Sequence, residues 1–554
     1  MVIGTPRGFR DILPGEARAR EAIRDKVRAC FDAHGYVPVE TPLLEDRSVL
    51  ECAGRIKGSP FQLFDSDNRL LMLRPDLTLP IARLTAQRLG RADLPARLRY
   101  EAPVVREQGA LRGEPRQFTQ LGVELIGGAE TDSEVEVVTL LAETLRALEV
   151  PRVRIVAGSV RPLLALLETD VADASLREEV LAQVHASNLV ALDEAVDAAA
   201  LPRPVARALH ELPRLHGDAS VIDCVDELLE GACVPAERRG TAELRALVAG
   251  VAGTDAAPEL SFDFSIINSF DYYTGIIFKA YVDGVAASLA SGGRYDAVLA
   301  NLGMPATAAC GFALSLERLQ EVLGACGAAD APAPNVNIGA RPLRIAVPKG
   351  SLFAPTLAAL EAAGLPVDDL RDYGRKLIIA AGDVEYVIVR ATDAPAFVAH
   401  GGADCGICGS DSLIEADLDL LQVADLGYGA CRFIVAEPAD RAGQAERAYA
   451  WRGAMRVATK YPRITQAYYD RIGQQVDILA LHGNIELGPI VGMTDRIVDI
   501  TATGTTLREN NLIIVDDVME CTARFFAGPA AYRCDARIRE LADRLAAATA
   551  KKGE

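Results

Sequence analysis

Asp499-Ile500-Thr501-Ala502-Thr503-Gly504-Thr505-Thr506 is the stretch that decides the fold of the second half of the chain. It follows an apolar run, 496–498, and leads into Leu507-Arg508-Glu509-Asn510, which predicts a buried strand, a turn of small hydroxylated residues and the start of a helix. Such a turn directs backbone N–H groups and threonine hydroxyls to one point, which suits a phosphate, and the Asp499 carboxylate can accept hydrogen bonds from sugar hydroxyls. The alternative is an ordinary turn in which Thr503 or Thr505 only caps the helix.

Composition predicts a globular protein of several domains. The chain has 554 residues, half of them hydrophobic, and a net charge of −19, which argues against a protein that coats nucleic acid. No apolar run approaches the roughly 20 residues that span a membrane, and the N-terminus has no signal-peptide pattern, so we expect a cytoplasmic location.

The 11 cysteines are scattered and odd in number, which favours reduced thiols over a disulfide framework. Cys405-Gly406-Ile407-Cys408 is the only Cys-x-x-Cys motif. Two interpretations stay open for it: a structural metal or redox site, or small residues that pack a strand and its turn.

The first half of the chain predicts helices around an antiparallel sheet. Its opening helix is expected at 16–34, with Ile23, Val27 and Phe31 on one face. Strands are expected at 36–42, 70–74, 98–105, 117–126 and 276–282, and residues 156–260 are expected to be mostly helical.

Several spaced motifs in this half resemble class II aminoacyl-tRNA synthetases of the histidyl type. The matching segments are 99–106, 116–127, 270–275, 291–296 and 311–319, so the resemblance covers about the first 325 residues. It implies a class II synthetase-like α+β fold with an antiparallel sheet core.

Departures from the synthetase motifs argue against ATP binding and amino-acid activation in this half. Asn268 stands where active histidyl-tRNA synthetases carry an arginine, and asparagine cannot stabilise the negative charge of the activation step. Glu107-Gln108 and Glu114 replace further motif residues. A synthetase-like body without these groups resembles the regulatory subunit of short-form ATP phosphoribosyltransferase, and tRNA binding is not expected.

This resemblance also implies a regulatory histidine pocket. The residues that match histidine-contacting positions, or lie in the same motifs, are Asp76, Thr78, Arg106, Gln120, Glu124, Tyr272 and Tyr273. Carboxylates suit an ammonium or an imidazole N–H, and hydroxyls suit the remainder. The alternative is a buried polar network whose members only pair with one another.

A Pro/Ala/Gly-rich linker at 326–342 separates the domain at 1–325 from a second one at 343–548. Beyond the linker strands and helices alternate, which predicts two α/β lobes joined by crossing strands. The fold class expected for this domain is periplasmic-binding-protein-like. Lobe I is expected to span about 343–435 plus 515–548, and lobe II about 436–514.

The second domain resembles the short-form catalytic subunit of ATP phosphoribosyltransferase along its length. The matching segments are 346–350, 389–395, 406–411, 456–462, 483–489 and the opening stretch. Ser351 and His482 depart from the family pattern, and both could change substrate affinity without removing the reaction.

The resemblance implies transfer of a phosphoribosyl group to N1 of ATP with release of pyrophosphate, the first step of histidine biosynthesis. The expected catalytic residues are Lys349, Arg390 and Glu486, and those that bind phosphoribosyl pyrophosphate or ATP are Asp499, Thr501, Thr503, Gly504, Thr505, Thr506, Asp411 and Arg432. Lys460 is a weaker match. Mg²⁺ is expected with the pyrophosphate, without an assigned protein ligand.

Histidine is expected to inhibit through the N-terminal domain, and self-association into a homo-oligomer is implied. Two other functions stay open. One is a non-catalytic sensor of histidine or a nucleotide, and the other, which Asn268 disfavours, is an active histidyl-tRNA synthetase.

Overall fold

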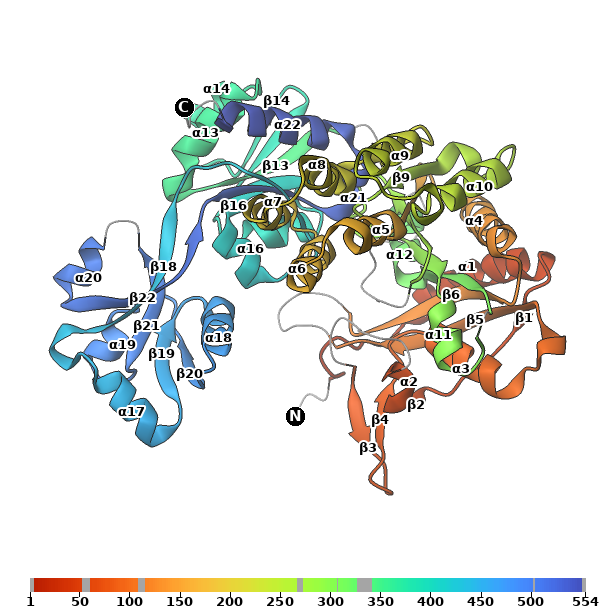
Figure 1. Cartoon of the computed structure of the whole chain (residues 1–554), viewed down its shortest axis with the longest axis horizontal. Coiled ribbons are helices and arrows are strands. Elements are labelled where there is room, and N and C mark those ends of the chain that lie inside the picture. The colour runs from red at the N-terminus through yellow and green to blue at the C-terminus, as the bar shows by residue number, and fades with distance from the viewer. Residues whose placement is uncertain are drawn as a thin grey trace. The chain divides into compact units, whose positions relative to one another are not determined.

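The computed structural model describes residues 4–51, 60–107, 115–266, 273–305, 307–325, 341–501 and 504–550. The chain forms two compact units, Met1–Ala340 and Arg341–Glu554, whose elements are labelled in Figure 1. Within the described ranges, no helix combines the length and the apolar character that crossing a bilayer requires.

The first unit is built on a nine-stranded sheet. The strand order is β1 (Val37–Pro38), β5 (Ala96–Val105), β6 (Gln117–Ile126), β12 (Ala309–Ser315), β11 (Ala290–Arg294), β10 (Ile276–Val282), β7 (Val153–Ser159), β9 (Leu260–Asp263) and β8 (His216–Gly217). All neighbours are antiparallel except β1 with β5 and β7 with β9. The predicted antiparallel core is therefore confirmed, although only Val37–Pro38 of the expected strand at 36–42 is paired.

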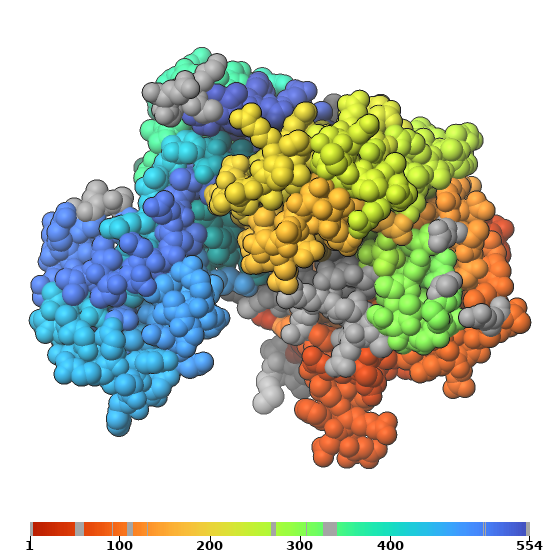
Figure 2. Space-filling model, viewed as in Figure 1, coloured from red at the N-terminus to blue at the C-terminus, as the bar shows by residue number. Residues whose placement is uncertain are grey.

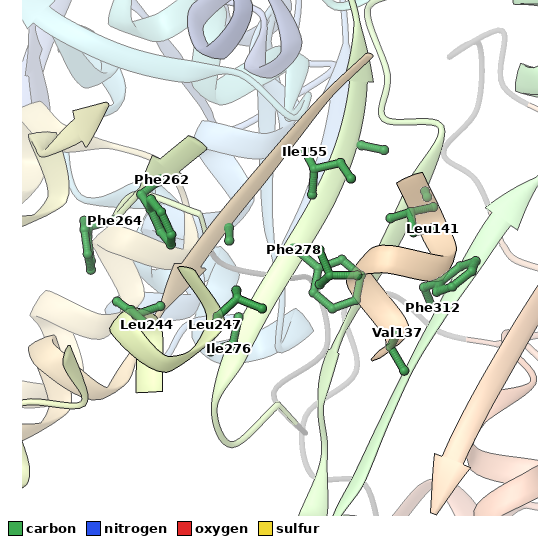
Figure 3. Packing of buried hydrophobic residues seen from close by; sticks show 14 of the residues in the cluster. Val137, Leu141, Ile155, Leu244, Leu247, Phe262, Phe264, Ile276, Phe278 and Phe312 are labelled. Carbon is green, nitrogen blue, oxygen red and sulfur yellow. The ribbon is translucent and has the colours of Figure 1, made fainter. Parts of the chain in front are cut away.

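Helices pack against this sheet through apolar faces. They include α1 (Pro14–Ala33), α4 (Glu130–Ala147), α10 (Thr241–Val251) and α12 (Leu316–Ala325). On α4, Val137 and Leu141 are four residues apart, so they share one face, and Figure 3 shows them beside Phe312 of β12 in the buried cluster. The region 156–260 is mostly helical as predicted, with α5 (Arg161–Asp170), α6 (Ala174–His185), α7 (Leu189–Ala198), α8 (Arg203–Glu211) and α9 (Val221–Gly231).

The first unit also contains a small three-stranded sheet, and α3 (Thr78–Arg88) follows its strand β4 (Leu70–Leu73) in the chain. The strand order of this sheet is β2 (Leu44–Asp46), β4 and β3 (Gln62–Phe64). The remaining helices are α2 (Arg47–Glu51) and α11 (Asp296–Asn301).

The second unit contains two mixed sheets. The first has the order β14 (Ile378–Ala381), β15 (Val384–Val389), β13 (Leu343–Pro348), β16 (Cys405–Gly409), β23 (Ala523–Ala527) and β17 (Leu421–Asp425). The second has the order β20 (Val476–Ala480), β19 (Met455–Thr459), β21 (Arg496–Thr501), β18 (Cys431–Pro438) and β22 (Leu512–Cys521). We call each sheet with its helices the first lobe and the second lobe. Figure 2 shows most of the second lobe in blue as a rounded body.

Both sheets are covered on their two faces. The first lobe has α13 (Phe353–Ala362), α14 (Asp368–Arg371), α15 (Ala394–Ala399), α16 (Ser410–Ala416), α21 (Pro529–Cys534) and α22 (Ala536–Ala550). Cys405 belongs to the core under α13 and α22, whereas Cys408 belongs to the core on the opposite face. The second lobe has α17 (Gln444–Arg452), α18 (Pro462–Arg471), α19 (Leu487–Ile490) and α20 (Thr505–Glu509).

The chain passes between the lobes twice, and the two crossings are neighbours. One is the segment 426–430 between β17 and β18, and the other is Thr522 between β22 and β23. The Thr522 hydroxyl donates to Asp425 Oδ1 at 2.8 Å, and the Ala523 N–H donates to the Tyr428 carbonyl at 2.9 Å. The sequence-based lobe boundaries at 435 and 515 cut through β18 and β22, whereas both strands pair along their length in the second sheet. Local hydrophobic pattern does not specify which sheet a strand joins.

Candidate functional site

Three predicted site residues of the first lobe follow neighbouring parallel strands. Pro348 of β13 is in register with Val389 of β15, and Ala346 of β13 is in register with Gly406 of β16. Lys349 and Arg390 come directly after β13 and β15, Asp411 comes two residues after the end of β16, and the Lys349 N–H donates to the Val389 carbonyl at 2.7 Å. Because the carboxyl ends of parallel strands meet at one edge, the three residues lie along the same edge of the sheet.

The second lobe repeats this arrangement. β19 is parallel to both β20 and β21, and Thr459 of β19 is in register with Val498 of β21. Lys460 and Asp499, the next residue after each of these, therefore lie beside each other at the carboxyl end of β19. Burial raises the pKa of Asp499 to about 6, Glu486 adds to the rise, and Lys460 opposes it. Glu486, which caps α19, therefore lies close to Asp499.

The predicted strand, turn and helix at 496–510 are confirmed where the structure describes them, as β21 and α20. The Gly504 N–H donates to the Thr501 hydroxyl at 2.8 Å. Gly504 has a φ of +68°, a left-handed conformation that favours glycine. Ala502 and Thr503 lie outside the described residues, as does the side chain of Thr505, while Thr506 is exposed. Contact of this turn with a phosphate stays a prediction.

Lys460 connects the two edges electrostatically. Burial raises the pKa of Asp411 in the first lobe, and Lys460 opposes this rise just as it does for Asp499 in the second lobe. Lys460 therefore lies close to carboxylates of both lobes. Lys460 was only a weaker match in the sequence analysis, although it directly follows a parallel strand, as Lys349 and Arg390 do.

Arg432 occupies a different environment from the other cations. It is in register with Thr501, beside the turn, but its guanidinium pairs with Asp517 at 3.0 Å on the exposed side of β18 and β22. Its charge is thus already shared with a carboxylate. The two departures from the family pattern, Ser351 and His482, are both exposed near the ends of strands.

In the first unit, the predicted histidine pocket is organised around Glu124 of β6. Thr78 donates to Glu124 Oε1 at 2.8 Å, and Tyr295 donates to Oε2 at 2.6 Å. Burial raises the pKa of Glu124 to about 8, although the hydroxyl of Tyr295 opposes the rise. Gly311 is required beside it, since a Cβ there would lie 2.0 Å from Glu124 Oε2. The sequence-based set did not include Tyr295 or Tyr100, whose hydroxyl lies 3.4 Å from Glu124 Oε1.

Two buried acceptors in this cluster have no hydrogen-bond partner. Asp76 Oδ1 accepts from the Leu79 N–H at 3.2 Å, whereas Asp76 Oδ2 and Gln120 Oε1 are unpaired in the structure as described. Gln120 and Glu124 are four residues apart on one strand, so they share a face. Buried polar atoms are normally paired, and two unpaired acceptors therefore point to a ligand that donates hydrogen bonds.

The remaining pocket residues surround Asp76. Burial raises the pKa of Asp76 to about 6, and the charge of Arg106 opposes this rise. Arg106 donates to the Pro75 carbonyl at 2.8 Å and lies over the Phe118 ring, 5.0 Å from its centroid. Tyr273 lies close enough to Tyr100 to influence its pKa, while Tyr272 and Asn268 fall outside the described residues.

Comparison with known proteins assigns the second unit. A family model described as ATP phosphoribosyltransferase matches residues 390–547. The ATP phosphoribosyltransferase of Rubrobacter xylanophilus is 51% identical over 193 residues, which cover 35% of this chain and 89% of that protein. The chain belongs to the ATP phosphoribosyltransferase family.

The first unit is similar to the regulatory subunits that accompany this enzyme. A family model described as histidyl-tRNA synthetase matches residues 8–319. The ATP phosphoribosyltransferase regulatory subunit of Moorella thermoacetica is 35% identical over 325 residues, which cover 57% of this chain and 80% of that protein. A solved structure from Bacillus halodurans, titled as an ATP phosphoribosyltransferase regulatory subunit/histidyl-tRNA synthetase, is 27% identical with a TM-score of 0.54 and covers 70% of this chain and 93% of that one.

The predicted fusion is therefore confirmed. One chain joins an ATP phosphoribosyltransferase domain to a regulatory domain of the same system, and the enzyme class follows from the second domain. This transferase acts in the first step of histidine biosynthesis.

Proposed function

We propose that Lys349, Arg390, Lys460, Asp411, Glu486 and Asp499 form one active site, in which the phosphoribosyl group passes from phosphoribosyl pyrophosphate to N1 of ATP. The observation that supports this proposal most is that the charge of Lys460 reaches carboxylates of both lobes, because it opposes the rise in the pKa of Asp411 in one lobe and of Asp499 in the other. Lys349, Arg390 and Lys460 follow strands directly, and Asp499 lies near the carboxyl end of β21, an edge where α/β proteins commonly bind ligands.

The charges fit the chemistry of the transfer. Departure of pyrophosphate builds negative charge on the leaving group, which Lys349, Arg390 and Lys460 would stabilise. Positive charge develops on the ribose, where Asp499 would accept hydrogen bonds from the hydroxyls and Glu486 would lie nearby. The turn at 501–506 would bind the 5′-phosphate through its N–H and hydroxyl groups, because α20, with five residues, supplies little helix dipole.

Adenine N1 already has a lone pair, so the site needs no strong general base. Holding N1 and the ribose carbon in line would then supply much of the rate enhancement. Lys349 and Arg390 are exposed in the structure, which leaves them available to a polyphosphate.

The carboxylates of the site also suit Mg²⁺. The described residues contain no group of three or more metal-ligating side chains that could hold an ion alone. Mg²⁺ typically binds through one or two carboxylates together with phosphates and water, and Asp499 and Glu486 offer such carboxylates. When bound, the ion would neutralise charge on the departing pyrophosphate.

We further propose that the first unit binds histidine and restrains the transferase. An α-ammonium or an imidazole N–H would satisfy Asp76 Oδ2 and Gln120 Oε1, two buried acceptors of this pocket for which the described residues provide no partner. Self-association through this unit is also proposed, since Leu44 and Phe64 of the small sheet expose 38% and 68% of their surface, and Val37 of the edge strand β1 exposes 56%. We also propose that the second unit has a periplasmic-binding-protein-like fold. A cytoplasmic location is proposed as well.

The deciding experiment mixes the protein with ATP, Mg²⁺ and phosphoribosyl pyrophosphate and follows the absorbance of the product. Product formation that requires both substrates supports the transferase. Intact nucleotide and histidine binding without any product would instead support a sensor. Histidine-dependent exchange between ATP and pyrophosphate would reveal an active synthetase, and we expect none.

A further inference from the structure

Two cysteines mark the places where the chain crosses between the lobes of the second unit. Cys431 is the first residue of β18 and Cys521 is the last residue of β22, so one thiol lies at each crossing. The two residues are directly opposite in the antiparallel pair. Opposite residues in such a pair have Cα atoms about 4.5–5.5 Å apart, within the range of about 4.4–6.8 Å that a disulfide requires.

The two thiols differ in exposure and acidity. Cys431 is half-buried, whereas only 2% of Cys521 is exposed. A hydrogen bond between the thiols lowers the pKa of Cys431 and raises the pKa of Cys521. Cys431 is therefore the more acidic and the more exposed thiol of the two, with Cys521 as its neighbour, which is the usual arrangement of a redox-sensitive pair.

The Cys-x-x-Cys motif does not share these properties. Cys405 and Cys408 belong to cores on opposite faces of the first sheet, so their side chains point away from each other. Burial raises the pKa of both thiols. The packing interpretation of this motif is confirmed, and its thiols are poor candidates for oxidation.

We propose that Cys431 and Cys521 form a reversible disulfide when the protein meets a hydroperoxide. The Cys431 thiolate attacks one oxygen of hydrogen peroxide, so that an S–O bond forms, the O–O bond breaks and the hydroxide released takes up a proton to become water. Cys521 sulfur then attacks Cys431 sulfur, an S–S bond forms, and the S–O bond breaks with loss of a second water that carries the Cys521 proton. Two thiols are oxidised by two electrons, and a dithiol reductant reverses the change.

This link would join the two crossings covalently. The segment 426–430 and Thr522 are the chain's two passages between the sheets, so any movement of one lobe against the other must bend them. The Ser410 N–H donates to the Thr522 carbonyl at 3.0 Å, so the crossing next to Cys521 contacts the neighbour of Asp411 at the start of α16. The link would thus restrict lobe movement and disturb one edge of the active site, an effect on activity that rests on the proposed function.

The test oxidises the full-length protein with hydrogen peroxide and maps its peptides by mass spectrometry. The expected result is a peptide pair linked through Cys431 and Cys521, lighter by about 2 Da than the two reduced peptides, and reversed by dithiothreitol. Transferase activity should fall by about tenfold on oxidation and return on reduction. Peroxide that oxidises the exposed Cys224 and Cys233 but leaves Cys431 and Cys521 unlinked overturns the proposal.

Variants separate the link from general oxidation. Cys521→Ser and Cys521→Ala should form no link, keep their activity in peroxide, and carry a sulfenic acid on Cys431 that dimedone traps. Cys224→Ser, which removes an exposed thiol of the first unit, should behave as the unmodified protein does. Equal loss of activity in the Cys521 variants would contradict the role of the link. If the disulfide forms but the reduced protein has no transferase activity, the result would support the proposed thiol chemistry and contradict the proposed transferase function.

Discussion

At the scale of single residues, Lys460 is the cation whose removal should be most informative. Its charge opposes the rise in the pKa of both Asp411 and Asp499, so Lys460→Met should remove a counter-charge from two partly buried carboxylates and the proposed contact to the pyrophosphate. We expect kcat/KM to fall by about 10²-fold, roughly 3 kcal/mol of transition-state stabilisation, in steady-state assays. Lys376→Met is the matched control, because Lys376 is an exposed lysine of the same unit. Equal kinetics for the two variants would remove Lys460 from the active site.

Glu124 allows a prediction about proton exchange on histidine binding. Its pKa of about 8 means that the carboxyl is mostly protonated at pH 7 when the pocket is empty. An ammonium ligand favours the carboxylate, lowers this pKa and expels the proton. Calorimetry at pH 7 in two buffers of different ionisation enthalpy should show proton release, and Glu124→Gln should abolish it. Proton uptake would contradict the proposed contact.

The affinity for histidine should depend on pH, because the carboxyl groups of the pocket must lose protons when the ligand binds. Asp76 and Glu124 must both lose protons to pair with a cation, and their pKa values are about 6 and about 8. Histidine should therefore bind more tightly as the pH rises from 6 to 8, in titrations of the full-length protein. Asp76→Asn should remove the lower part of this rise and leave the upper part.

At the scale of elements, α16 of the first lobe holds the beginning of α18 in the second. The Glu415 carboxylate accepts from the N–H groups of Arg463 at 3.1 Å and Ile464 at 3.3 Å, and the Arg463 guanidinium pairs with Asp417 at 2.8 Å. Because α18 begins two residues after Lys460, this contact should fix the position of that ammonium.

Glu415→Ala should therefore lower kcat by about fivefold to tenfold while changing substrate KM less, because the helix start loses its cap and Lys460 is held less firmly. Glu415→Gln, which keeps an acceptor oxygen, should recover part of the loss. Glu361→Ala, which removes an exposed carboxylate paired with Arg371, is the control. If the two alanine variants have the same kcat, α16 does not position Lys460.

At the scale of the whole molecule, the fusion predicts a reciprocal coupling between histidine and substrates. If histidine weakens the binding of phosphoribosyl pyrophosphate by some factor, saturation with that substrate must weaken histidine binding by the same factor. Equilibrium titrations of each ligand with and without the other should give equal factors. Millimolar histidine that alters neither activity nor substrate affinity would end the regulatory proposal.

The sequence predicted features that depend on neighbouring residues, but not contacts between residues that are far apart in the chain. The alternation of strands and helices after residue 343 and the turn at Gly504 follow from local periodicity and local conformation, and the structure contains them. The pairing of Arg432 with Asp517, across 85 residues of sequence, depends on which strands become neighbours, and nothing local encodes that choice. The same holds for the place of β18 and β22 in the second sheet.

The candidate sites show the same division. Residue type and motif predicted Glu124 and Asp499, but their raised pKa values arise from burial, which only the assembled fold creates. That oxygens of Asp76 and Gln120 find no partner among the described residues depends on the packing of distant segments, which local sequence does not reveal.

The two adjacent crossings between the lobes also limit how these lobes can move. A lobe attached by a single segment can rotate about several axes, whereas a lobe attached by two neighbouring, hydrogen-bonded segments can rotate mainly about one hinge axis. Rotation about this axis opens the space between the lobes only on the side away from the two segments. Ligands that bind between the lobes must then enter and leave by the same side, so the molecule seated nearest the hinge arrives first and departs last.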